Sequence, residues 1–106
     1  MTRLKMNPKI RYELILNAAL AICSEPGGWN TLTIQKVAQQ AHCTSGLVYH
    51  YFGSIDSLRR KLVKVSIKRE NFDVLIQALT SAHPEALKMN RLLQQLVFAH
   101  MLKPGV

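Results

Sequence analysis

A short run of small and polar residues in the middle of the chain has the composition of a phosphate-binding helix start. Thr44 and Ser45 favour a helix N-terminus, where free backbone N–H groups and the helix dipole attract a phosphate oxygen. Gly46 has no side chain, so the backbone can approach a sugar-phosphate wall closely. The ring of Tyr49 can pack under the helix while its hydroxyl reaches a phosphate, and His50 is the adjacent candidate. The run therefore predicts binding to a phosphate-bearing partner.

The charge of the chain favours the same kind of partner. Fourteen Lys and Arg against six Asp and Glu give the 106 residues a formal net charge of +8. Nucleic acid is the first candidate and an anionic membrane surface the second. A membrane span needs roughly 18 consecutive apolar residues, far more than any uninterrupted stretch here. The length suits one globular domain, or a small domain with a dimerisation arm.

The cysteines and histidines allow two other kinds of chemistry, but their spacing favours neither. Cys23, Cys43, His42 and His50 match no zinc-finger or ribbon pattern, and Cys23 lies on an apolar helix face. His42 and Cys43 could imitate a base and a nucleophile, yet adjacent residues in a turn rarely face each other. We expect no metal, no cofactor and no enzyme activity. Since no export signal is visible, we also expect free, buried thiols in the cytoplasm.

Three short helices must position the phosphate-binding run. Asn7 and Pro8 predict the start of a helix over about 8–24, which the segment 25–28 ends and beside which Trp29 fills the core. Thr33 predicts the cap of a second helix over about 33–41. Its apolar face is formed by Ile34, Val37, Ala38 and Ala41. Its polar, solvent-facing side is formed by Gln35, Lys36, Gln39 and Gln40.

The third helix, over about 45–51, has Thr44 or Ser45 as its cap, and Gly53 ends it. Ser54 then caps a long basic helix that begins close to Ile55, with a buried stripe through Leu58, Leu62 and Val65. Three short helices with a tight turn between the second and third are the arrangement of a helix-turn-helix.

These residues also carry a family resemblance. The sequence resembles the tetracycline-repressor (TetR) family of transcriptional regulators over about its first sixty residues. The matching positions are Ile15, Leu16, Ala18, Ala19, Thr31-x-Thr33, Val37-Ala38-x-x-Ala41, Thr44-x-Gly46-x-Val48-Tyr49-x-Tyr51-Phe52 and Ser54-x-Asp56-x-Leu58.

The resemblance implies which residues contact DNA. The family pattern implies that Ser45, Leu47 and Gln35 contact base edges. Gln can bond adenine bidentately, and Leu offers an apolar contact to a thymine methyl. An A·T-leaning half-site follows. Tyr49 contacts a phosphate in this pattern. Further expected contacts come from Thr33, Lys36, His50 and an N-terminal arm with Arg3, Lys5, Lys9 and Arg11.

The chain departs from the family in three places. His42-Cys43 stands in the turn where the family usually has Gly-Val, and Ile55 stands where it usually has a phosphate-binding Lys. Arg59 or Lys61 is the expected replacement for that Lys. The family normally carries a much longer C-terminal ligand-binding domain, so we do not expect an enclosed effector pocket.

The C-terminal half predicts a dimerisation module. The segment 70–82 either continues the long basic helix after a bend or forms a separate helix, and His83-Pro84 starts a last helix that is apolar on nearly every side. Its polar positions hold Gln and Asn more than Lys, which disfavours a membrane-surface helix. Packing against a second copy in a four-helix arrangement would bury it. The predicted interface residues are Leu87, Leu92, Leu93, Leu96, Val97 and His100.

The sequence thus predicts an all-α protein with a helix-turn-helix DNA-binding domain over 1–53 and a helical dimerisation region over 54–106. We expect a cytoplasmic homodimer that binds a palindromic operator and represses transcription. One alternative is a small structural DNA-binding protein that coats or clusters sites. Another is a protein-interaction module whose basic charge recruits an acidic partner, with incidental DNA affinity.

Overall fold

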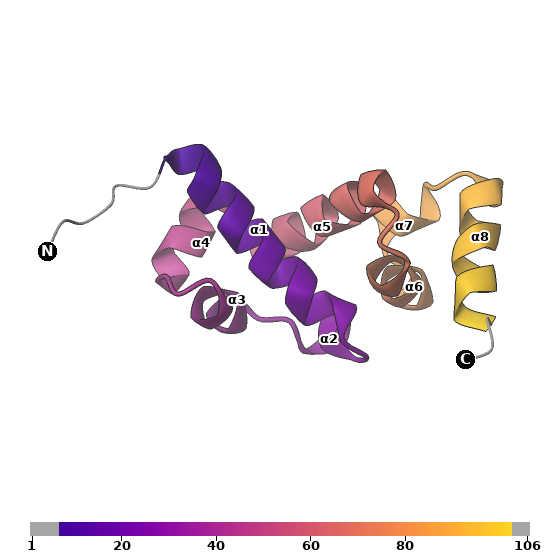
Figure 1. Cartoon of the computed structure of the whole chain (residues 1–106), viewed down its shortest axis with the longest axis horizontal. Helices are drawn as coiled ribbons and strands as arrows, with labels where there is room; N and C mark the ends of the chain where they lie inside the picture. Colours follow the sequence, from indigo (N-terminus) through magenta and orange to yellow (C-terminus); the bar gives the residue numbers. More distant parts are fainter. Residues whose placement is uncertain (1–6, 103–106) are drawn as a thin grey trace, which may run out of the picture.

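A computed structural model describes residues 7–102, and within this range the chain is all-α. Arg3 and Lys5 of the predicted N-terminal arm lie outside the described residues. The helices are α1 (Pro8–Ser24), α2 (Gly28–Thr31), α3 (Ile34–Gln40), α4 (Ser45–Phe52), α5 (Ile55–Arg69), α6 (Phe72–Thr80), α7 (Pro84–Leu87) and α8 (Arg91–Leu102). The elongated molecule has α3 and α4 near one end and α8 at the other (Figure 1).

Short polar side chains start the helices of the N-terminal half. The side-chain oxygen of Asn7 accepts a hydrogen bond from the Lys9 N–H, and Pro8 occupies the first position of α1. The hydroxyls of Thr33, Thr44 and Ser54 accept from the backbone N–H groups three residues further on, at 3.0–3.2 Å. The sequence allowed either Thr44 or Ser45 as the N-cap of α4, and in the structure the N-cap is Thr44.

The core of the N-terminal half lies between α1, α3, α4 and α5. Ile15, Leu16, Val37, Val48 and Leu58 are fully or almost fully buried there. Trp29 is also buried, which confirms its predicted place beside the turn after α1. The turn itself contains α2, a single helical turn that the sequence did not predict.

The C-terminal half contains more helix breaks than the sequence predicted. The segment 70–82 is a separate helix, because Glu70 takes a left-handed conformation after α5 and Asn71 caps α6. The predicted single last helix is wrong: it divides into α7 and α8. At the break, Asn90 accepts from the Leu93 N–H at 2.8 Å, and Gln94 donates to the Met89 carbonyl at 2.9 Å.

The helix α8 packs on α6 with one side only. Val97 is fully buried in the chain's own core, with Leu93 partly buried beside it. His100 lies 3.4 Å from an Asp73 carboxylate oxygen and packs against Phe72. Val97 is therefore part of the chain's own core, which corrects its predicted assignment to a dimer surface. His100 is exposed, and its assignment to that surface stays a prediction.

Candidate nucleic-acid interface

The outward face of α4 consists of the residues that do not support its packing. Val48 and Phe52 point into the core, where Tyr12 of α1 stacks on Phe52 with ring centroids 4.9 Å apart. The residues on the opposite side of α4 are exposed: Gly46, Tyr49 and His50. Because α4 lies near the end of the molecule that is far from α8 (Figure 1), this face is free to enter a groove.

The turn before α4 determines where this helix starts. His42 has a left-handed backbone with φ of 55°, and the Cys43 N–H donates to the Ala38 carbonyl at 2.9 Å. A side chain in this conformation costs roughly 1–2 kcal/mol, which explains why a glycine would suit the position. The tight reversal lets α4 start against α3.

The N-terminus of α4 is exposed and rich in donors. The Thr44 side chain caps the Leu47 N–H, while the N–H groups of Ser45 and Gly46 belong to the first turn, which lacks intrahelical acceptors. A phosphate oxygen close to this turn would accept from them and meet the positive end of the helix dipole. Thr44 is exposed and Ser45 is half-buried.

Gly46 is not required by the fold. A Cβ atom at this position would meet only the Thr44 hydroxyl oxygen, at 3.9 Å, which is an ordinary contact. A side chain could therefore point straight out into solvent without disturbing the chain. The absence of a side chain matters only for a surface that approaches from outside.

The other predicted contact residues divide into exposed and partly buried ones. Thr33, Gln35 and Lys36 are exposed at the start of α3, which packs against α4. Tyr49 is 48% exposed, so its hydroxyl is accessible. Ser45 and Leu47 are half-buried, and Leu47 packs against the core, which leaves Gln35 as the most exposed of the three predicted base readers.

Arg59 does not belong to this face, which corrects the first of the two replacements that the sequence offered for the missing Lys. Its guanidinium donates to the Trp29 carbonyl at 3.2 Å and lies over the Trp29 ring, 5.7 Å from the centroid. Lys61 is exposed, and its ammonium lies 6.0 Å from the centre of the Tyr12 ring. Tyr12, which the sequence did not single out, thus joins the cation of α5 to the aromatic cluster behind α4.

The two cysteines are free, and they differ in burial. Cys23 is fully buried, and this burial raises the pKa of its thiol to about 11. Cys43 is only half-buried, so the prediction of two buried thiols is right for Cys23 alone. Burial also raises the pKa of the Cys43 thiol, although Arg11 opposes the shift. Within residues 7–102 no group of three His, Cys, Asp or Glu side chains could hold a metal ion.

An exposed helix that follows a tight turn and has free backbone N–H groups in its first turn is typical of the recognition helix of a helix-turn-helix DNA-binding protein. Comparison with known families identifies the kind. Residues 15–62 match the family described as bacterial regulatory proteins, tetR family. The match runs from within α1 into α5 and includes α3 and α4.

Residues 15–62 are therefore a tetR-family N-terminal DNA-binding domain, as the resemblance implied, and the protein is a DNA-binding transcriptional regulator. The chain has no match among curated proteins or among solved structures. In the part of the chain that the structure describes, no helix is both long and apolar enough to cross a lipid bilayer.

Proposed function

We propose that the protein is a transcriptional repressor that binds a palindromic operator as a homodimer, with one α4 in the major groove of each half-site. One observation supports this most directly. The face suited to DNA lies near one end of the molecule, and large exposed apolar side chains lie on α7 and α8 at the other end (Figure 1).

These apolar side chains are unusually exposed for a monomer. Leu92 is 66% exposed and Leu102 is 74% exposed. The others on α7 and α8 are Leu87, Leu96, Phe98 and Met101. Large apolar side chains exposed to this degree on two consecutive helices favour a protein interface, because water contact with each side chain is unfavourable.

A second copy of the chain is the partner that fits best. Only one side of α8 packs on α6, and the exposed apolar residues flank that side in both directions. A two-fold axis brings the same apolar patch from two copies together, so that each α8 is covered by its counterpart. Helices from both copies then form one bundle core.

The dimer also accounts for specific DNA binding. Two α4 helices related by a two-fold axis match a palindrome whose half-sites are about 34 Å apart, or one helical turn. The Ser45 and Gly46 N–H groups, Tyr49 and Lys61 bind the backbone, while Gln35 reads bases, with a preference for adenine. A net charge of +8 strengthens the attraction to phosphates.

Repression follows when the operator overlaps a promoter, because the bound dimer blocks polymerase. The simplest arrangement is autorepression of the protein's own promoter, in the cytoplasm, where bacterial DNA lies. The proposed function is binding alone and needs no catalytic step. It also includes no small-molecule effector.

A selection of genomic fragments at physiological salt tests the proposal, followed by footprinting and by transcription in vitro from the recovered promoter. We expect one short protected palindrome and lower transcription when the protein is added. A protected array without a unique site would instead favour a coating protein. A monomer without preference among DNA sequences would refute the proposal.

Gly46→Arg is the matched variant in this experiment, because the chain has open space at this position. We expect the variant to fold but to lose the selected site. If it keeps full function in the cell, DNA binding is incidental and the protein acts by recruiting an acidic partner.

A further inference from the structure

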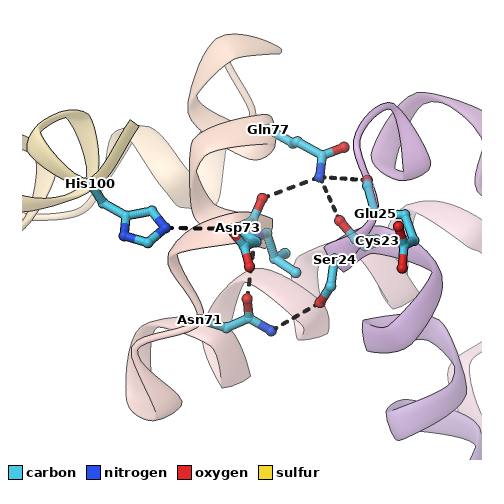
Figure 2. Close-up of polar contacts among 8 residues, drawn as sticks. Cys23, Ser24, Glu25, Asn71, Asp73, Gln77 and His100 are labelled. Carbon is cyan, nitrogen blue, oxygen red and sulfur yellow. Dashed lines mark hydrogen bonds and ion pairs between the residues drawn. The ribbon is translucent and has the colours of Figure 1, made fainter. Parts of the chain in front are cut away.

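The end of α1 and the start of α2 leave backbone groups without partners in their own helices. The residue before α2 is Gly27, which has no side chain to cap it. Gln77 of α6, 48 residues after Trp29, bonds to backbone groups of Trp29, Cys23 and Glu25 at this junction. Its side-chain oxygen accepts from the Trp29 N–H at 2.9 Å. Its amide nitrogen donates to the Cys23 and Glu25 carbonyls at 2.6 and 3.1 Å (Figure 2).

The bonds of Gln77 join α6 to the end of α1 and the start of α2, and this place is called the joint below. Two further side chains hold Trp29 there. Its ring meets the His83 ring edge-on, with centroids 5.5 Å apart, and Arg59 of α5 covers it and donates to its carbonyl. Trp29 itself is only 3% exposed. One residue of the N-terminal half is thus fixed by side chains from α5, α6 and the turn before α7.

This joint connects the two halves of the molecule at a second place. The first connection is α5, which packs on α4 and also on α7. A single rod would still allow the halves to rotate about its axis. In Figure 1, α6 lies beside the end of α1 and next to α2, away from the line of α5, so a bond there opposes such a rotation.

We propose that Gln77 is a positioning residue that fixes the orientation of α1–α4 relative to α6–α8 and thereby sets the half-site spacing that the dimer accepts. The inference rests on the proposed function, because the dimer forms through α7 and α8. Each added base pair moves a half-site by about 3.4 Å and turns it by about 34°. A rigid joint cannot follow that change, so the second half-site is lost, whereas a loose joint can.

The test compares Gln77→Leu with the wild type on duplexes that carry the two half-sites from the genomic selection, with their separation changed one base pair at a time. Leu removes every polar atom at similar size, and the carbonyl of the exposed Glu25 keeps its hydrogen bond from the Gly28 N–H. We expect the wild type to lose about tenfold in affinity for a change of one base pair, and the variant less than about threefold.

Gln94→Leu is the matched control. Gln94 also donates to two backbone carbonyls, those of Leu87 and Met89, but both lie within α7–α8 and the turn between them. We expect it to lower the unfolding temperature as Gln77→Leu does. We also expect it to keep the wild-type spacing profile, that is, the dependence of affinity on the separation of the half-sites. A merely structural role for Gln77 would lower affinity equally at all spacings.

A second variant keeps the test decisive if Gln77→Leu does not fold. Gln77→Glu retains the acceptor for the Trp29 N–H and loses the donors to Cys23 and Glu25. We expect it to flatten the spacing profile as well.

The inference is overturned if the foldable Gln77 variant keeps a sharp profile, if Gln94→Leu flattens it equally, or if the wild-type profile is flat. A wild-type protein that is monomeric or selects no site overturns the proposed function instead, and this inference with it.

Discussion

Replacement of Leu92 by Ala should separate the dimer without unfolding the chain. Leu92 is 66% exposed in the single chain, and full burial of a leucine is worth about 1.5–3 kcal/mol. Its burial at a two-fold interface would therefore contribute about 1–2 kcal/mol for each copy. Since Ala keeps part of this, the dimer should weaken by about 2–3 kcal/mol, or about 30- to 150-fold in dissociation constant.

Two other substitutions separate an interface effect from a general loss of apolar surface. Ile10 is 54% exposed, but it lies on α1 rather than on α7 or α8. Ile10→Ala should leave the dissociation constant unchanged. Val97 is fully buried inside the chain, so Val97→Ala should lower the free energy of unfolding by about 1–3 kcal/mol.

Sedimentation equilibrium over a range of protein concentrations measures the dissociation constant, and urea denaturation measures the free energy of unfolding. The proposed interface is refuted if Leu92→Ala dimerises like the wild type. It is also refuted if Ile10→Ala weakens the dimer as much as Leu92→Ala does, because the contact between the copies would then lie elsewhere.

Three further predictions test other parts of the structure. Gly46→Ala should not lower the thermal unfolding midpoint, because a Cβ fits there, and should weaken specific DNA binding in fluorescence anisotropy; equal affinity would contradict a close approach of the backbone to DNA. His42→Gly should stabilise the chain by about 1 kcal/mol in urea denaturation, because φ is 55° there, and a loss of stability would contradict the strain. Burial lowers the pKa of His83 below its ordinary 6.5, with Arg60 and Arg59 adding to the effect and Glu85 opposing it. The folded state therefore prefers neutral His83, so its contribution to stability is complete above pH 6.5 and is lost as the pH falls below that value. Urea denaturation from about pH 7.5 to about pH 5 should show this loss, and His83→Asn, which keeps a capping side chain for α7, should reduce it.

The helix starts of the N-terminal half were predictable because their causes are local. Thr33, Thr44 and Ser54 each bond a backbone N–H three residues away, so the sequence contains both partners within one turn. The left-handed residue at His42 was visible only as a departure from the family pattern.

The unpredicted helix α2 has a cause that no local pattern contains. Its backbone N–H at Trp29 is capped by Gln77, which belongs to a different helix. A sequence with Pro26, Gly27 and Gly28 indicates a turn, and the partner that makes this turn partly helical becomes apparent only when α6 is in place.

The choice between Arg59 and Lys61 shows a similar limit. The two residues are about 200° apart around α5, so only one of them can lie on the DNA side. Leu58 and Leu62, both fully buried, fix the rotation of α5 and turn Arg59 toward Trp29. The sequence supplied the buried stripe, but the position of Trp29 relative to that stripe is a property of the fold.

The separation of the two surfaces implies that specificity depends on protein concentration. The residues that pack α1, α3, α4 and α5 together all come from one chain, so a monomer keeps its α4 and can still occupy one half-site. Two half-sites bound by one dimer gain from high effective concentration, and this gain disappears when the dimer dissociates. Leu92→Ala should therefore bind a single half-site like the wild type and lose only the advantage of the palindrome, whereas Gly46→Ala should weaken binding to both DNAs.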